Sequence, residues 1–295
     1  MYMNISLIKK LLIPAFLLAL VSCEKDYKSI AELDKKNIQE YMQKNNLNMI
    51  ADTSGIYYEI ISPGTGAPID YKDKIPMHFS QKSLDGAYIN ADTIINRYAD
   101  FFGYLSPIGI REGVKKYLKN RGGKIRLIVP SRQAFGRNGT TKIPANASLD
   151  YVVTVLDDKK LSAYEDNSIK KYLQQSNLSG FTMTSSGLYY KIIAAGVGSP
   201  ITQDSLISVN YTGKLLNGTV FESGESKPTS VLRFIKGWVE AVPMINEGGQ
   251  IRIVVPSNLA YGNEGSKNGK GGYTIPPFSI LDFDIKVLKV EEPSN

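Results

Sequence analysis

The sequence predicts an α+β protein with two similar domains, each an antiparallel sheet wrapped around one short helix and preceded by another short helix. Three observations support this prediction. A set of short motifs occurs twice, apolar residues alternate with polar ones in the second copy, and only one segment inside that copy, 239–245, has a convincing helical pattern. Period-two alternation is typical of half-buried antiparallel strands. Such strands wrapped on one helix define the α+β class.

The internal repeat predicts where the domains lie. Segment 54–61 (SGIYYEII) matches 186–193 (SGLYYKII), and Ile143-Pro144 matches Ile275-Pro276 at the same offset of 132 residues. Between these motifs, 125–131 matches 251–257 at an offset of 126, so each copy has six extra residues at a different place. Insertions that differ between copies belong in loops. We expect domains over 51–158 and 184–292, with a linker helix over 159–183.

A short helix is expected before each copy. Ser29-Ile30-Ala31-Glu32 and Ser162-Ala163-Tyr164-Glu165 both fit the capping box, in which a serine and a glutamate satisfy free backbone N–H groups. Apolar residues then recur on one helix face, and these are Ile38, Tyr41 and Met42 in the first helix and Ile169, Tyr172 and Leu173 in the second. Such a face docks on its own domain or serves as a dimerisation arm. Docking is the commoner case, and we expect a monomer.

The N-terminal segment has the pattern of a secretion signal. Lys9-Lys10 precede a short apolar run over 11–21, too short to span a membrane, and Ser22-Cys23 follow. Leu20-Val21-Ser22-Cys23 resembles the lipobox of bacterial lipoproteins. That resemblance implies that 1–22 is a removed signal peptide, that Cys23 carries the lipid anchor, and that 23–50 is a tether and short helix. The expected location is the cell envelope, on the outer membrane. Cys23 is the only cysteine, so no internal disulfide is possible.

Composition excludes several classes of function. Hydrophobic residues make up 42% of the chain, enough for a packed core. The net charge of +7 comes without a basic stripe interleaved with aromatic residues, so we expect no nucleic-acid partner. The single histidine, His78, has no cysteine partner and is interpreted as a strand residue. The glycine-rich loop over 263–273 lacks phosphate-loop spacing and is interpreted as a flexible flap. We expect no metal and no cofactor.

Six short motifs follow one another in the second copy. They are VNYTG at 209–213, GTVFES at 218–223, FIKGW at 234–238, LAYG at 259–262, IPP at 275–277 and LDFDI at 281–285. Each is weak alone, but together and in this order they resemble the FKBP family of peptidyl-prolyl isomerases. The resemblance implies eight site residues: Tyr211, Phe221, Glu222, Ile235, Trp238, Tyr261, Ile275 and Phe283. Glu222 stands where the family usually has aspartate.

The resemblance also implies a role for each residue. Trp238 would form the floor under a prolyl ring, and Tyr211, Phe221, Ile235 and Phe283 its walls. The Tyr261 hydroxyl and the Ile235 backbone N–H would donate to substrate carbonyls, and Ile275 would lie on a flap above. Isomerisation of an X-Pro amide faces a barrier of roughly 18–20 kcal/mol and needs neither nucleophile nor metal. A dry apolar site with placed donors favours the twisted amide over the planar one.

The first copy departs from this pattern. Its equivalents are Phe79, Ile89, Asn90, either Ile110 or Glu112 at the tryptophan position, Phe135, Ile143 and Tyr151. It also has an insertion rich in aromatic residues, with Tyr98, Phe101, Phe102 and Tyr104. The insertion is interpreted either as an extra strand packed on the sheet or as an exposed surface for unfolded proteins.

Three functions compete at this stage. The first is a prolyl isomerase acting on proline-containing, unfolded or partly folded envelope proteins. The second is a chaperone or protein-binding module that kept the fold and lost turnover. The third, a surface receptor, rests only on lipidation and aromatic residues. Trp238 and Tyr261 favour the enzyme.

Overall fold

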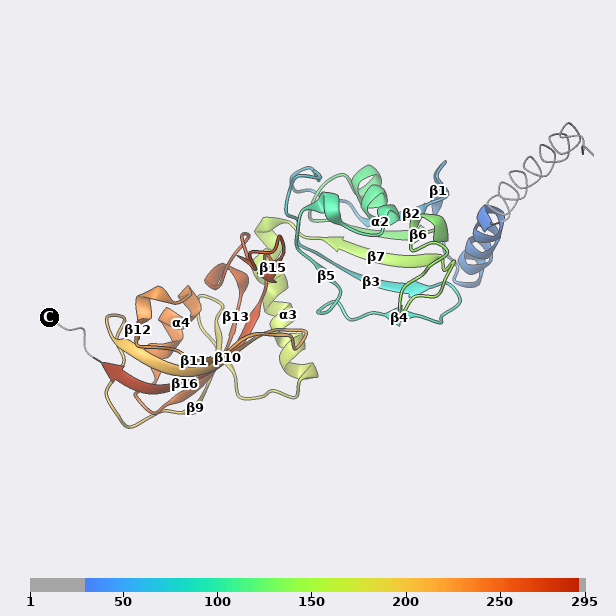
Figure 1. Ribbon diagram of the computed structural model, residues 1–295. Coiled ribbons are helices and arrows are strands. Elements are labelled where there is room, and N and C mark those ends of the chain that lie inside the picture. The colour runs from blue at the N-terminus through green and yellow to red at the C-terminus, as the bar shows by residue number, and fades with distance from the viewer. Residues whose placement is uncertain (1–29, 292–295) are drawn as a thin grey trace, which may run out of the picture.

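The computed structural model describes residues 30–291, which form two separate seven-stranded sheets (Figure 1). The strands of the first sheet are β1 (Ile50–Ala51), β2 (Tyr57–Ser62), β3 (Met77–Ser83), β4 (Ile89–Asn90), β5 (Arg97–Tyr98), β6 (Lys124–Val129) and β7 (Leu149–Val155). Those of the second are β8 (Thr182–Met183), β9 (Tyr189–Ala194), β10 (Leu206–Leu215), β11 (Val220–Glu225), β12 (Thr229–Ser230), β13 (Gln250–Val255) and β16 (Leu281–Glu291).

The two sheets have the same topology. The first has the order β1-β2-β6-β7-β3-β4 with β5 on β3, and the second has β8-β9-β13-β16-β10-β11 with β12 on β10. Every pairing is antiparallel. The repeat in sequence is therefore a repeat of topology, and helices on antiparallel sheets agree with the predicted class. We call residues 50–156 the first repeat and 182–291 the second repeat.

Short helices cover one face of each sheet. In the first repeat α2 (Ile108–Gly113) continues as a π-helical turn, Val114–Leu118, and in the second α4 (Lys236–Ala241) continues as a 3-10 turn, Val242–Met244. The second helix was expected around 239–245, so that prediction was three residues late at its start. Pro243 lies in the first turn of the 3-10 segment, where its missing N–H needs no partner. Further 3-10 turns are Phe102–Tyr104, Ser131–Gln133, Asp158–Lys160, Val231–Arg233 and Ser257–Leu259.

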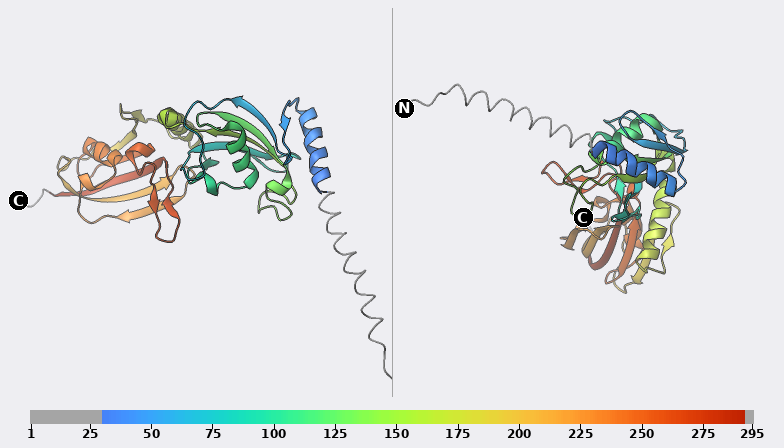
Figure 2. Two further views of the ribbon diagram at one scale, coloured as in Figure 1. Left: turned by 90° about the horizontal axis from the view of Figure 1, so that it is seen from above. Right: turned by 90° about the vertical axis from the view of Figure 1, so that its right-hand side faces the viewer.

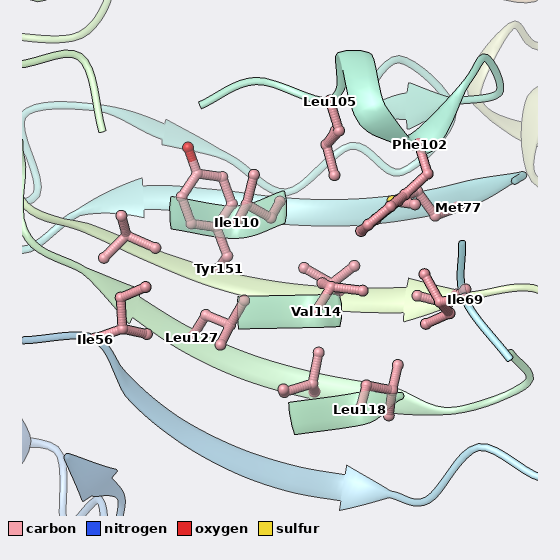
Figure 3. Close-up of a cluster of buried hydrophobic side chains, with 14 of the residues drawn as sticks. Ile56, Ile69, Met77, Phe102, Leu105, Ile110, Val114, Leu118, Leu127 and Tyr151 are labelled. Atoms are coloured by element: carbon pink, nitrogen blue, oxygen red, sulfur yellow. The ribbon is translucent and has the colours of Figure 1, made fainter. Parts of the chain in front are cut away.

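Each repeat has its own hydrophobic core between helix and sheet. Figure 3 shows the first, where Ile110 and Val114 of the helical segment face Leu127 of β6 and Tyr151 of β7, all fully buried. The second core contains Trp238, Ile253 and Phe283 among its members.

The two leading helices pack on the opposite face of each sheet. Residues 30–44 form the first helix, and α3 (Leu161–Gln175) forms the second, which lies between the two sheets. Ile169, Tyr172 and Leu173 of α3 are buried against Tyr189 and Val254 of the second sheet. The corresponding face of the first helix packs around Tyr57 and Ile128. The helix over 30–44 and the end of β16 lie at opposite ends of the molecule (Figure 2). Each apolar face therefore docks on its own domain.

A tyrosine of each leading helix binds an ion pair within the sheet that the helix covers. Asp282 of β16 is 0% exposed and accepts hydrogen bonds from Arg252 Nε at 3.0 Å and Nη2 at 2.7 Å. The Tyr172 hydroxyl of α3 donates to the same carboxylate at 2.6 Å. The first repeat has the same arrangement, in which Arg126 and Tyr41 bind Asp150. We call each set the Arg-Asp-Tyr cluster.

The capping-box prediction for α3 was wrong. The helix begins at Leu161, and its N-cap residue Lys160 makes no side-chain cap bond. The Glu165 carboxylate, 2% exposed, instead accepts a hydrogen bond at 2.9 Å from Ser257 N, at the turn that leads into residues 260–262. This tertiary hydrogen bond replaces the local one because the helix docks against a turn with a free N–H. Ser29 of the other predicted box lies outside the described residues.

The aromatic insertion of the first repeat packs mainly against its own sheet. Tyr98 lies on β5, pairs with Met77 of β3, and donates its hydroxyl to Phe101 O. Phe102 is fully buried, whereas Tyr104 is 74% exposed. The packed interpretation therefore accounts for most of the insertion.

The two repeats contact each other through the same insertion and α3. His78 of β3 stacks on Tyr164 of α3, with ring centroids 4.8 Å apart and planes at 11°. Ile94 packs on the cluster formed by α3 and the second sheet. A cavity of about 130 Å³ lies beside Arg97, between the insertion, α3 and residues 215–217 and 276–280. The strand interpretation of His78 is confirmed, with an added contact between repeats.

Cys23 and the predicted signal peptide lie outside the described residues. Among residues 30–291, no helix combines the length and the apolar character that crossing a membrane requires.

We predict that acid weakens the contact at His78. The pKa of His78 is lowered to about 4 because burial disfavours the imidazolium, and Lys124, Arg97 and Lys171 add positive charge nearby. The folded chain then binds fewer protons than the unfolded chain between about pH 6.5 and pH 4, so stability falls as pH drops through this window. Over that range we expect the free energy of unfolding to fall by about 2–3 kcal/mol more in the wild type than in His78→Phe.

Proton NMR of this single histidine and urea unfolding at each pH provide the measurements. An imidazole that titrates near pH 6.5 in the folded protein contradicts the prediction.

Candidate active site

Eight residues of the second repeat surround a cavity of about 230 Å³. They are Tyr211, Glu222, Arg233, Phe234, Ile235, Trp238, Tyr261 and Phe283. Six of them were predicted from the sequence, and they come from β10, β11, the start of α4, the turn after β13, and β16. The fold therefore gathers side chains that are up to 72 positions apart in the chain.

Trp238 forms the base of the cavity because α4 lies unusually close to the sheet. A Cβ atom on Gly237 would lie 2.6 Å from Val255 Cγ1, so only glycine permits this approach. Trp238, the next residue, is 2% exposed. Phe234 stacks on its ring at 4.7 Å and 25°, and Tyr211 and Phe283 meet it edge-on, each at 5.3 Å. These packed aromatic rings fix the tryptophan in one orientation.

Hydrogen-bond donors line the apolar cavity. Burial and then the neighbouring Glu222 carboxylate raise the pKa of Tyr211 to about 12, and burial first, then Glu222, raises the pKa of Tyr261. Both hydroxyls are therefore protonated donors at neutral pH. The Ile235 N–H, just before α4, makes no backbone hydrogen bond among the described residues. The buried Trp238 Nε1 also has no protein partner there.

The backbone around Tyr261 holds its side chain at the cavity rim. The 3-10 turn Ser257–Leu259 ends at Ala260, and Gly262 has a φ of +54°, a conformation that glycine adopts readily. Gly262 N donates to Ser257 O at 2.8 Å, and Gly262 O accepts from Phe278 N at 2.7 Å. Tyr261 itself is 38% exposed, so the residue is open to solvent on one side.

Two predicted site residues lie outside the cavity lining. Phe221 packs edge-on against Phe283 at 5.6 Å and supports that wall from behind. Ile275 was expected on a flap above the site, but it is 3% exposed and belongs to the core. Its strand β15 (Tyr273–Ile275) pairs with β14 (Ser266–Lys267). The segment predicted as a flexible flap thus contains a two-stranded hairpin, and the hairpin ends at a buried residue, Ile275.

Sequence reasoning missed two lining residues, Arg233 and Phe234. Phe234 precedes Trp238 by four positions, and the two rings stack because the chain turns into α4 between them. An aromatic pair at this spacing was a usable signal. Arg233 ends a 3-10 turn, and no pattern in the sequence marked it.

The first repeat places its equivalent residues in the same fold positions with different surroundings. Gly109 matches Gly237, since a Cβ there would lie 2.3 Å from Val129 Cγ1, and this makes Ile110 rather than Glu112 the match for Trp238. Phe79 and Tyr151 meet edge-on at 6.0 Å. Phe135 is partly buried on the core, and Ile143 is 5% exposed.

The outer wall of the first repeat is open. Ile89, at the position of Phe221, is 67% exposed, so it does not pack on the sheet. Asn90, at the position of Glu222, donates from Nδ2 to Asn96 Oδ1 at 2.8 Å. The side chains at these two positions therefore do not reproduce the walls of the second repeat.

A backbone difference separates the repeats as well. Counting back from the matched glycines, Pro107 stands at the position of Ile235 and Ser106 at that of Phe234. Proline has no N–H, so the first repeat lacks the donor that precedes α4 in the second. With Ser106 in place of Phe234, the first repeat also lacks the ring that stacks on Trp238 in the second.

Comparison with known proteins gives the family. The profile described as "FKBP-type peptidyl-prolyl cis-trans isomerase" matches residues 198–288, within the second repeat. A probable FKBP-type isomerase FkpA from Neisseria meningitidis is 31% identical over 196 residues, covering 61% of this chain and 70% of the relative. A probable FKBP-type isomerase from Haemophilus influenzae is 42% identical over 116 residues, covering 38% and 46%. The 22 kDa FKBP-type isomerase of Escherichia coli is 37% identical over 125 residues, covering 41% and 58%.

The chain belongs to the FKBP-type peptidyl-prolyl cis-trans isomerase family. Peptidyl-prolyl isomerase is accordingly the enzyme class that the family and these relatives give it. The chain spans 70% of the Neisseria relative and about half of the other two.

We predict that Gly213→Ala disturbs the cavity while Gln81→Ala does not. A Cβ on Gly213 would lie 2.6 Å from Phe221 Cζ and 2.7 Å from Phe283 Cε1, so the alanine must displace the rings that support Trp238. We expect the free energy of unfolding to fall by about 1–3 kcal/mol and the fluorescence emission of Trp238 to shift. Gln81 occupies the matching position on β3 and already carries a Cβ, so its alanine variant is the control.

Because Trp238 is the only tryptophan, its emission during urea unfolding reports the second repeat alone. Equal emission and equal unfolding midpoints in both variants would contradict the prediction.

Proposed function

We propose that the cavity of the second repeat isomerises X-Pro peptide bonds. This proposal rests on one observation: a buried aromatic base, Trp238, and hydrogen-bond donors at the rim line the same cavity. A prolyl ring fits against the indole, where apolar walls exclude water from the amide. Twisting breaks amide conjugation, so an apolar site stabilises the twisted form relative to water.

Hydrogen-bond donors at the site would hold the substrate in the twisted form. The Tyr261 hydroxyl and the Ile235 N–H bind carbonyl oxygens on either side of the bond that rotates. Both are held by the backbone, Tyr261 by the turn before Gly262 and Ile235 by the start of α4. Donors fixed before the reaction need no reorganisation during it. Burial first, and then the charge of Glu222, raise the pKa of Tyr211 and of Tyr261 further above neutral pH, so both hydroxyls stay protonated.

The first repeat is a non-catalytic member of the pair in this proposal. It has Ile110 at the tryptophan position, Phe135 at that of Tyr261, and Pro107 at that of Ile235. It lacks a flat aromatic base, a hydroxyl donor and a backbone donor. The first repeat therefore has the same sheet topology as the second but not the groups that would catalyse isomerisation.

The substrates in this proposal are proline-containing, unfolded or partly folded proteins of the cell envelope. An apolar, solvent-accessible cavity accepts an exposed X-Pro segment more readily than a folded one. The lipobox-like Leu20-Val21-Ser22-Cys23 supports anchoring at the outer membrane through Cys23, with the signal peptide 1–22 removed. Several acyl chains together hold a protein stably on a membrane.

We predict that residues 24–295 accelerate cis-trans exchange in an X-Pro peptide, and that Tyr261→Phe lowers kcat about three- to thirtyfold. Losing a donor used mainly in the transition state lowers kcat with little change in KM. Phe135→Ala, at the matching position of the first repeat, serves as the control and keeps wild-type turnover. Exchange is measured by NMR line shapes or a protease-coupled assay. Equal losses in the two variants would place the site elsewhere, and an inactive, folded wild type would favour a protein-binding module.

We predict that Cys23→Ala moves the protein out of the membrane fraction or leaves the signal peptide attached. The thiol is the only one in the chain, so the variant removes the only sulfur atom to which a lipid could be attached. Detergent phase partitioning and the mass of the mature chain provide the readouts, with Ser22→Ala as the control. A Cys23→Ala protein that partitions and migrates like wild type argues against the anchor.

A further inference from the structure

A lysine of the first repeat reaches the Tyr261 loop of the second. Lys74 Nζ lies 3.1 Å from Asn263 O and 3.1 Å from Glu264 Oε2. The Lys74 side chain is 15% exposed, whereas that of Glu264 is 75% exposed, so the lysine is largely covered and its carboxylate partner faces solvent. The ammonium also lies 5.7 Å from the ring centroid of Phe101 and 6.0 Å from that of Tyr273. Lys74 therefore contacts both the start and the end of the segment that follows Tyr261.

A second contact between the repeats supports the other side of the same loop. The Arg97 guanidinium donates to Phe278 O and lies 3.5 Å from the Glu165 carboxylate. Phe278 N in turn donates to Gly262 O at 2.7 Å, and Glu165 accepts from Ser257 N at 2.9 Å. Arg97 thus contacts both sides of the Tyr261 turn through one intermediate residue each. Phe278 links it to Gly262, and Glu165 links it to Ser257.

The corresponding turn of the first repeat is held within its own unit. Asp34 of the leading helix accepts from Ser131 N at 3.0 Å, as Glu165 does from Ser257, and its other oxygen accepts from Ser148 Oγ at 2.9 Å. In the second repeat, Arg97 from the neighbouring unit supplies the additional partner of the carboxylate. Among these described contacts, only the carboxylate at the Tyr261 turn has a partner in the other repeat.

We propose that Lys74 is a positioning residue for Tyr261, and that the first repeat thereby sets the turnover of the second. The inference rests on the proposed function of the second repeat's cavity. Asn263 and Glu264 are exposed loop residues one turn from the hydroxyl donor, and loops without such contacts sample many arrangements. A displacement of about 1 Å at a reacting group costs much of the rate. Lys74 restricts that displacement from outside the catalytic unit.

The test uses residues 24–295 with Lys74→Met, which keeps the apolar stem and removes the charge. We expect kcat on an X-Pro peptide to fall about three- to tenfold with KM unchanged. Lys72→Met, at an exposed lysine two positions away, keeps wild-type turnover. Lys74→Arg keeps a positively charged donor at the same place, and we expect it to retain at least half of the wild-type kcat.

A double mutant separates positioning from a general structural effect. In a Tyr261→Phe background the hydroxyl is gone, so Lys74→Met should lower kcat by less than about twofold. Amide hydrogen exchange gives a readout that does not depend on turnover. Gly265 N, which donates to Tyr261 O at 3.1 Å, should exchange faster in Lys74→Met, with the unfolding midpoint of Trp238 unchanged.

Two outcomes overturn the inference. One is unchanged turnover and unchanged exchange in Lys74→Met, and the other is a full loss of rate even in the Tyr261→Phe background. If wild type shows no isomerase activity, the proposed function fails by itself, and exchange at Gly265 still decides whether Lys74 holds the loop.

Discussion

The buried Arg-Asp-Tyr cluster is the interaction on which each repeat depends. Asp282 has no contact with water, so its charge requires the paired hydrogen bonds from Arg252 and the one from the Tyr172 hydroxyl. Removing one partner of a buried pair leaves an uncompensated charge, which costs several kcal/mol. Because the tyrosine comes from the leading helix, the cluster fixes that helix on the sheet. The helix then presents Glu165 to the turn that carries Tyr261.

The same cluster in both repeats explains how the scaffold persisted while the cavities diverged. Asp150 and Asp282 occupy matching strands, and their carboxylates bind an arginine and the tyrosine of the leading helix, none of which lines the cavity. The stabilisation that the cluster provides does not depend on which residues surround Trp238. In the second repeat Gly213 leaves room for the rings of Phe221 and Phe283, whereas the first has Gln81 and an outward-facing Ile89. The changes are coupled, since loss of the ring at 89 makes the glycine unnecessary.

Contact between the repeats gives the degenerate unit a physical role in our proposals. The insertion that distinguishes the first repeat carries Arg97, and the strand before it begins shortly after Lys74. Both cations reach backbone oxygens of the second repeat. A domain without its own site can in this way influence a neighbouring one by restricting a loop.

The sequence by itself determined the two-fold repeat, the antiparallel strands and six of the eight cavity residues, because these depend on period-two alternation and on motifs in a fixed order. Tertiary structure alone decided the rest. Ile275 is buried because the hairpin folds its base into the core, and Glu165 does not cap its own helix because docking of α3 places it where it accepts from Ser257 N. The equivalence of Ile110 with Trp238 needed the close approach of Gly109 to the sheet. Lys74 had no local signal at all, since its partners are some 190 residues away and only packing of the two repeats brings them together.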